Sequence, residues 1–254
     1  LQDIKEIGTS QINKLKETLL YYNITKEDLD KIEWFTFLMF IGDKISSKTM
    51  LGFINSGALS CFKRDRVVMV KEYNIWSDLT PAEKYFTKKY YAQLNKSPDS
   101  IQEILHIIID NKGYSKKTRL EILHKLLASI ENIPYNLEDT IDYLVHHEQE
   151  LIGTPLSCHI TDSLNNAHET HSCKDIVLGY KGYAVLKVCL EDVREWKIKN
   201  GPSSGENMAF VKASDNTCQI DNIVIFPNIY NQYSYLLSPG NMLYITGKIS
   251  QKGS

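Results

Sequence analysis

The spacing of apolar residues changes once along this chain, and that change constrains the fold more than any other feature. Before about residue 151 apolar side chains recur at intervals of three and four, as in Ile101, Ile104 and Leu105, which is the pattern of helices with one buried face. After about residue 174 the interval is two, as in half-buried strands. Helices followed by strands indicate an α+β protein or two separate domains. We predict an α+β chain in two parts.

The helical part contains several expected helix starts and stops. The expected N-caps are Thr25, Thr80, Ser100 after Asp99, and Asn136. Acidic residues follow these caps in the first turns, where the helix dipole favours negative charge. Turn-forming residues at 111–113 and 133–135 separate the helices. We interpret the stretch from about 79 to 151 as a compact helical packet without chemistry of its own.

The second part shows four alternating segments. They span residues 183–188, 208–212, 223–226 and 242–246. A Gly/Ser-rich run joins the first two, and a helical stretch at about 229–237 separates the third from the fourth. The order β-β-β-α-β is that of an OB-fold without its fifth strand. We therefore expect a partly complete OB-fold β-barrel, with the domain boundary between about 152 and 174.

The charge and the apolar content limit the functions that this chain can have. The net charge is −2, so the chain has no overall positive field, and nucleic-acid binding must depend on local patches and backbone amides. No apolar run approaches the ~20 residues needed to cross a bilayer, so we expect no membrane association.

The cysteines and the ends of the chain indicate its context. Five cysteines are scattered without a CxxC pair, which favours a reducing cytoplasm. The chain begins with Leu1 without a signal pattern, and it ends at Ser254 without closing an element. We expect a fragment of a longer cytoplasmic protein.

Several short motifs occur in a fixed order. Residues 4–12, IKEIGTSQI, form an apolar-Gly turn before a helix, with Thr9 or Ser10 available as the cap. Residues 45–59 end in an apolar-apolar-x-x-Gly-Ala turn, and Lys63-Arg64-Asp65-Arg66 follows. Residues 148–159 contain an acidic-Leu-apolar-Gly segment and then Leu-Ser-x-His. Three further motifs occupy 205–211, 225–230 and 245–250.

Together these motifs resemble the C-terminal region of the alpha subunit of bacterial DNA polymerase III, a C-family replicative polymerase. In that family a helix-hairpin-helix region precedes an OB-fold. The resemblance covers residues 1 to about 75 and 145 to 250. It divides the chain into a helix-hairpin-helix region at 1–75, a helical packet and candidate insertion at 76–151, a linker at 152–173 and an OB-fold domain at 174–254.

The chain departs from the family pattern in three places. Ile160 replaces the proline that usually follows the histidine, and Asn222 stands where an acidic residue is usual, with Asp221 beside it. No Gln-x-x-Leu-Phe segment lies between the two parts, so sliding-clamp binding is not carried over to this chain.

The resemblance implies a non-catalytic, DNA-binding tail. In the family the catalytic aspartates and their two divalent metal ions lie upstream, in the palm of the parent nucleotidyltransferase. Two-metal chemistry needs converging carboxylates, and this sequence offers no candidate set, so we expect no catalytic residue and no cofactor here. The implied partners are primer-template duplex DNA, single-stranded template and other replisome proteins.

The residues expected to contact DNA belong to the helix-hairpin-helix turn, a basic run and one barrel face. They are Lys5, Gly8, Thr9, Ser10, Lys14, Lys63, Arg64, Arg66, Arg194, Lys197, Lys199 and Phe210. A helix N-terminus offers backbone N–H groups to a phosphate, and aromatic rings in an OB groove stack on bases. The alternatives are that the lysines form a solvated surface and that Phe210 packs inward.

Two other interpretations remain open from the sequence. Residue types that could hold zinc occur at Cys158, His159, His168, His171 and Cys173, although without the usual paired spacing. The alternative function is a stand-alone protein-interaction module derived from such a polymerase, in which the helical packet binds a protein and DNA binding is weak or lost. The near-neutral charge supports that alternative.

Overall fold

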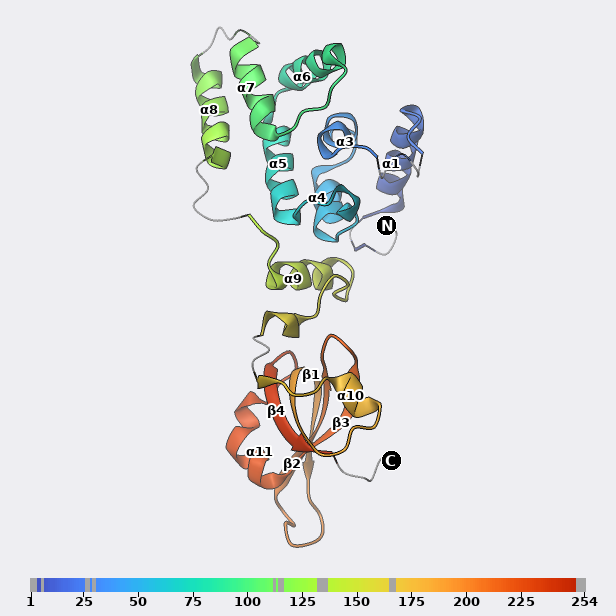
Figure 1. Ribbon diagram of the computed structural model, residues 1–254, viewed down its shortest axis with the longest axis vertical. Coiled ribbons are helices and arrows are strands. Elements are labelled where there is room, and N and C mark those ends of the chain that lie inside the picture. Colours follow the sequence, from blue (N-terminus) through green and yellow to red (C-terminus); the bar gives the residue numbers. More distant parts are fainter. Residues whose placement is uncertain are drawn as a thin grey trace. The chain divides into compact units, whose positions relative to one another are not determined.

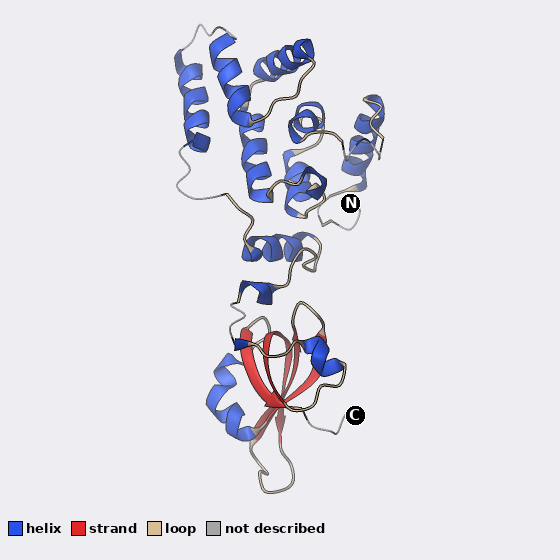
Figure 2. Cartoon of the chain, in the orientation of Figure 1, coloured by secondary structure: helices blue, strands red, loops and turns tan. Residues whose placement is uncertain are grey.

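The computed structural model has two compact units, Leu1–Pro155 and Leu156–Ser254 (Figure 1). It describes residues 4–5, 7–25, 28, 31–111, 113, 117–131, 137–164 and 168–249. The first unit is helical and the second is built on a four-stranded antiparallel sheet (Figure 2). The predicted α+β class is confirmed. In the described part of the chain, no helix is both long and apolar enough to cross a bilayer.

Amphipathic helices pack around one core in the first unit. They are α1 (Thr9–Tyr21), α3 (Trp34–Ile41), α4 (Ser47–Asn55), α5 (Arg66–Asp78), α6 (Pro81–Leu94), α7 (Ile101–Asn111), α8 (Lys117–Glu131) and α9 (Ile141–Leu151), with a 3-10 turn η1 (Ser60–Phe62). Helix α3 is apolar almost throughout, and its buried side chains lie in the centre of this core. A helix that is apolar on all sides is a buried helix.

The cap residues explain where these helices begin. The Thr80 side chain and Glu83 form a reciprocal capping box at α6, and the Ser100 hydroxyl accepts the N–H of Glu103 at α7. Both predicted starts are confirmed. The segment 133–135, Asn136 and residues 26–27 after Thr25 lie outside the described residues.

The predicted helix start at 137–139 is wrong. Thr140 is the N-cap of α9, and residues 137–139 are not helical. The physical reason is a competing contact. The Asp139 carboxylate accepts the backbone N–H groups of Arg66 at 2.9 Å and Val67 at 3.0 Å, so Asp139 supplies the start of α5 instead of the first turn of α9.

A buried ion pair joins α5 to α9. The Arg66 guanidinium donates to Glu148 Oε1 at 2.7 Å and to the carbonyl oxygen of Asn55 at 2.9 Å. The two charged side chains are only 9% and 1% exposed. Gly57 has a φ of +77°, and a Cβ at this position would collide with the guanidinium, so glycine allows the arginine to approach.

The second unit begins with short helical turns and continues as the sheet. Its elements are η2 (Ile160–Ser163), α10 (Cys173–Val177), β1 (Tyr183–Lys197), β2 (Asn207–Ser214), β3 (Gln219–Ile225), α11 (Pro227–Tyr233), η4 (Ser234–Leu236) and β4 (Met242–Lys248). The strand order is β3-β2-β1-β4. This sheet, with α11 between β3 and β4, is consistent with a partial OB-like sheet.

Strand β1 is longer than the predicted segment 183–188. Its first half pairs with β4, and its second half pairs with β2 from Cys189 to Lys197. A register shift between Leu190 and Asp192 separates the two halves. Sequence alternation cannot reveal such a strand as one element, because a bulge changes which face each residue occupies.

A carboxylate anchors α10 to the turn between β2 and β3. Asp215 Oδ2 accepts the N–H of Cys173 at 2.6 Å, and Oδ1 accepts the N–H of Thr217 at 2.8 Å. Oδ1 also accepts the Thr217 hydroxyl at 2.5 Å and the N–H of Cys218 at 3.1 Å. Burial alone would raise the pKa of Asp215, but these hydrogen bonds outweigh it and hold the pKa below its usual value.

Removal of Glu148 should destabilise the helical unit strongly. In Glu148→Ala the Arg66 charge stays buried without its carboxylate, which typically costs about 3–5 kcal/mol of unfolding free energy. Urea denaturation followed by circular dichroism measures the loss. Glu150→Ala, an exposed position on the same helix, is the matched control and should change stability little. Equal effects of the two substitutions would contradict a structural role for the Arg66–Glu148 pair.

Asp215 should contribute stability that depends on pH. Its folded pKa lies below the unfolded value of about 3.9, so the contribution is complete above that value and is lost as the pH falls through the folded pKa. We expect Asp215→Asn to be less stable than wild type at neutral pH, with the difference shrinking below about pH 4. Thermal unfolding over a pH series measures it. A difference independent of pH would show that the charge of Asp215 contributes nothing.

Candidate nucleic-acid interface

One side of the sheet in the second unit is only partly covered. Along β2, Ala209, Val211 and Ala213 are buried, whereas Met208 and Phe210 alternate with them and are half-buried. Successive residues of a strand point to opposite faces. Phe210 therefore lies on the less buried face, and the alternative of inward packing does not hold.

Cross-strand register extends this surface over three strands. On β1, Arg194 lies opposite Phe210 and Trp196 lies opposite Met208. On β3, Val224 lies opposite Phe210. Directly opposed residues share a face of the sheet. We call this surface the outer sheet face. Its members are Asp192, Arg194, Trp196, Met208, Phe210, Lys212 and Val224.

Trp196 is the most informative residue of the outer sheet face. Its side chain is 52% exposed, and the Lys199 ammonium lies 5.9 Å from its ring centroid. A cation at this distance from an indole is attracted by the ring. Trp196 is not among the residues predicted from the sequence to contact DNA, although its separation of two residues from Arg194 predicts a shared face. An exposed ring beside a cation is suited to stacking on a base.

The other predicted cations of this unit differ in position. Arg194 is 69% exposed, and its Nε lies 3.4 Å from the Asp192 carboxylate, an exposed ion pair that holds the guanidinium weakly. Lys197 ends β1 and, by alternation, points to the opposite side from Trp196. Lys199 belongs to the loop that joins β1 to β2. The structure therefore brings Arg194, Lys199 and Phe210 together around Trp196.

A second candidate surface is the start of α1. Gly8 is the N-cap, with φ −71° and ψ 152°, and no side chain caps the helix. The expected cap role of Thr9 or Ser10 is wrong, because both are already helical and Gly8 takes the cap position. The N–H groups of the first turn have no acceptor within a helix. Gly8, Thr9 and Ser10 are exposed, so the N–H groups of Thr9 and Ser10 can receive an anion.

Two helix starts meet at this place. The Gln11 side chain of α1 accepts the N–H of Ser46 at 3.4 Å, and Ser46 is the N-cap of α4. Lys5 and Lys14 are exposed on the same unit. The Lys5 backbone N–H donates to the carbonyl oxygen of Leu151, the last residue of α9, at 2.7 Å.

The basic run after η1 has three different environments. Lys63 is exposed and has a left-handed backbone, with φ of +51°. The Arg64 guanidinium pairs with Glu72 and lies 5.3 Å from the Phe35 ring centroid. Burial raises the pKa of Glu72, and the Arg64 charge opposes that shift. Arg66 is buried against Glu148, so its guanidinium serves the fold and is not presented to a ligand.

The residue types considered for zinc are not gathered into a metal site in the part of the chain that the structure describes. His159 Nδ1 lies 2.7 Å from the Thr161 hydroxyl, and Nε2 lies 3.1 Å from the Ser214 hydroxyl. The Cys173 thiol is buried in the core, and burial raises its pKa. These contacts hold the start of the second unit against its sheet.

Comparison with known proteins gives one consistent relationship. No family model matches the chain. It is 26% identical over 221 residues to the DNA polymerase III subunit alpha of Streptococcus pyogenes, which covers 83% of this chain and 20% of that protein. It is 29% identical over 116 residues to the DNA polymerase III subunit alpha of Staphylococcus aureus strain COL, which covers 45% of this chain and 10% of that protein. The chain therefore spans a fifth or less of the length of these relatives, and it is related in sequence to alpha subunits of DNA polymerase III.

Proposed function

We propose that this chain is a non-catalytic, DNA-binding part of a replicative polymerase of the DNA polymerase III alpha type. The observation that carries the proposal is the outer sheet face, where exposed Trp196 and half-buried Phe210 lie beside Arg194 and Lys199. The sequence relationship to polymerase alpha subunits supports it. Nucleotide transfer and its two metal ions belong, in this proposal, to the remainder of a cytoplasmic polymerase.

The outer sheet face is proposed to hold single-stranded template. Bases would stack on Trp196 and Phe210, while Arg194 and Lys199 would follow the backbone phosphates. Stacking of a base on an aromatic side chain typically contributes about 1–3 kcal/mol and tolerates any base. Such a site matches a polymerase, which must hold every template sequence equally.

The start of α1 is proposed to hold duplex DNA. Backbone N–H groups of Thr9 and Ser10 would donate to a phosphate, with Lys5 and Lys14 adding charge beside it. Contacts of this kind position DNA without reading its sequence. Lys63 and Arg64 extend the proposed surface, whereas Arg66 is left out because Glu148 occupies its guanidinium.

A specific observation favours a second candidate, a protein-interaction module. Large side chains are exposed from the N-cap of α11 to the turn that follows this helix. They are Phe226 at 62%, Ile229 at 43%, Tyr233 at 39% and Tyr235 at 75%. Exposed aromatic groups of this kind often mark protein contacts, and other replisome proteins are the corresponding partners.

Substitution of the two rings should weaken single-strand binding selectively. We expect Trp196→Ala with Phe210→Ala to lower affinity for single-stranded DNA at least tenfold, because about 1–3 kcal/mol is lost at each ring, while binding to fully paired duplex DNA changes little. Fluorescence anisotropy at two salt concentrations measures both. Tyr183→Ala removes an exposed ring at the other end of β1 and is the matched control. No binding of the wild type to either DNA at low salt would move the assignment to the protein-interaction module.

A negative charge at the start of α1 should weaken duplex binding without loss of stability. Ser10→Asp places a carboxylate where the helix dipole favours it, so the helix is preserved, but the carboxylate would repel a DNA phosphate. Ser10→Asn has a similar shape without the charge and is the control. Duplex titrations of the two variants are compared with their melting temperatures. Equal duplex affinities of the two variants would exclude α1 as the phosphate site.

A further inference from the structure

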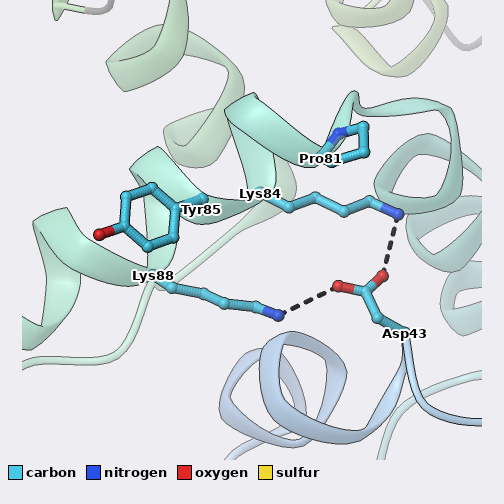
Figure 3. Close-up of a pocket in the computed structure, with 5 residues that line it drawn as sticks. All are labelled: Asp43, Pro81, Lys84, Tyr85 and Lys88. Atoms are coloured by element: carbon cyan, nitrogen blue, oxygen red, sulfur yellow. Dashed lines mark hydrogen bonds and ion pairs between the residues drawn. The ribbon is translucent and has the colours of Figure 1, made fainter.

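A hollow of about 370 Å³ opens beside α6 in the first unit. Helix α6 belongs to the helical packet that we interpreted as having no chemistry of its own. It is lined by Asp43, Pro81, Lys84, Tyr85 and Lys88 (Figure 3). Asp43 follows α3, and the other four residues belong to α6. The volume is in the range of pockets that bind small ligands or single groups of larger ones.

Two ammonium groups converge on one carboxylate in this hollow. Lys84 Nζ lies 2.9 Å from Asp43 Oδ1, and Lys88 Nζ lies 3.0 Å from Oδ2. Figure 3 shows both lysine side chains extending from α6 to the two oxygens of Asp43. Two positive charges and one negative charge leave an excess of one positive charge. The hollow therefore attracts an anion.

The cations are held in place before any ligand arrives. Both ammonium groups lie over the Trp76 ring, at 5.6 and 5.9 Å from its centroid. The Trp76 indole N–H donates to Asp43 Oδ1 at 3.2 Å. The side chains of Lys84 and Lys88 are only 16% and 28% exposed. Preordered and partly shielded cations lose less conformational freedom on binding, and their fields are less screened.

Donor capacity remains for a ligand. An ammonium group has three N–H donors. In the described contacts Lys84 uses two of these donors, one to Asp43 and one to the Ser77 carbonyl oxygen at 3.5 Å. Lys88 uses one donor, to Asp43. Tyr85 lies between the two lysines in the sequence, and its side chain is 69% exposed. The hollow thus combines free donors with an open aromatic ring.

We propose that this hollow binds a phosphodiester group of a single nucleic-acid strand, with the adjacent base stacked on Tyr85. The inference rests on the proposed DNA-binding function and extends it to a second place on the chain. An ordered ammonium pair beside an exposed ring matches the alternation of phosphate and base along a strand. An acidic peptide would use the ammonium groups without requiring the ring.

Removal of the two lysine charges and removal of the aspartate charge should have opposite effects on the affinity for single-stranded DNA. Lys84→Gln with Lys88→Gln changes the charge of the three groups from +1 to −1. The one proposed phosphate contact is then lost, so the slope of log affinity against log salt for single-stranded DNA should become shallower by about 0.7. Asp43→Asn removes the internal competitor and should tighten binding several-fold. Lys89→Gln, at an exposed position on α6 outside the hollow, is the matched control.

The test uses the full chain and its three tryptophans. The indole N–H signals in two-dimensional NMR serve as three separate reporters. The Trp76 signal reports on the hollow, and the Trp196 signal reports on the outer sheet face. Trp34 is 3% exposed, so its signal shows whether the core of the first unit is intact. Substitutions of Trp76 and Trp196 by Phe assign the signals. The probe is a short oligothymidylate, with inorganic phosphate and a polyglutamate peptide in parallel.

We expect the oligothymidylate to move the Trp76 signal in wild type and in Lys89→Gln, but not in the double lysine variant with its Trp34 signal unchanged. Tyr85→Ala should weaken this response. Movement of Trp196 without Trp76 would overturn the inference and leave the proposed function standing. If neither signal moves, both this inference and the proposed single-strand site on the outer sheet face fail. A Trp76 response as large with phosphate alone, or with polyglutamate, would overturn the assignment to a nucleic-acid strand.

Discussion

The second unit depends on the pairing of one strand with two neighbours. Strand β1 pairs with β4 through its first half and with β2 through its second half, with a register shift between Leu190 and Asp192. This register places Arg194 and Trp196 opposite Phe210 and Met208. A slip of one residue would turn the whole set to the other face. The proposed single-strand site is therefore a consequence of the bulge in β1 and not of the residues alone.

In the helical unit, some charged groups are buried in balanced pairs, whereas others leave a local excess of charge. Arg66 and Glu148 are buried against each other, whereas Lys84 and Lys88 share one carboxylate and leave one positive charge in excess. The net charge of the whole chain, −2, does not reveal this difference between a buried ion pair and a local excess of positive charge. Local geometry, rather than total charge, decides where an anion can bind, so the near-neutral balance is compatible with DNA binding at separate patches.

The sequence predicted the helix and strand classes because periodicity reports burial directly, and Thr80 shows that a capping box can be read from four residues. Sequence-based prediction failed where another residue takes the position or the contact that was expected of a neighbouring one. Asp139 caps α5 across 73 residues and so delays α9, and Gly8 takes the cap position from Thr9.

Trp196 was missed because β1 looked like a short strand. Arg66 looked like a surface cation because its partner Glu148 lies 82 residues away.

We propose that a nucleic-acid strand lies on the outer sheet face. Photochemical crosslinking tests it most directly: single-stranded DNA that carries 5-bromodeoxyuridine is irradiated with the full chain, and the attached peptides are identified by mass spectrometry. Stacked aromatic residues are expected to be the attachment points. We expect crosslinks at Trp196 or Phe210 that unlabelled DNA competes away. Specific crosslinks confined to the exposed residues at α11, or none at the outer sheet face, would contradict it.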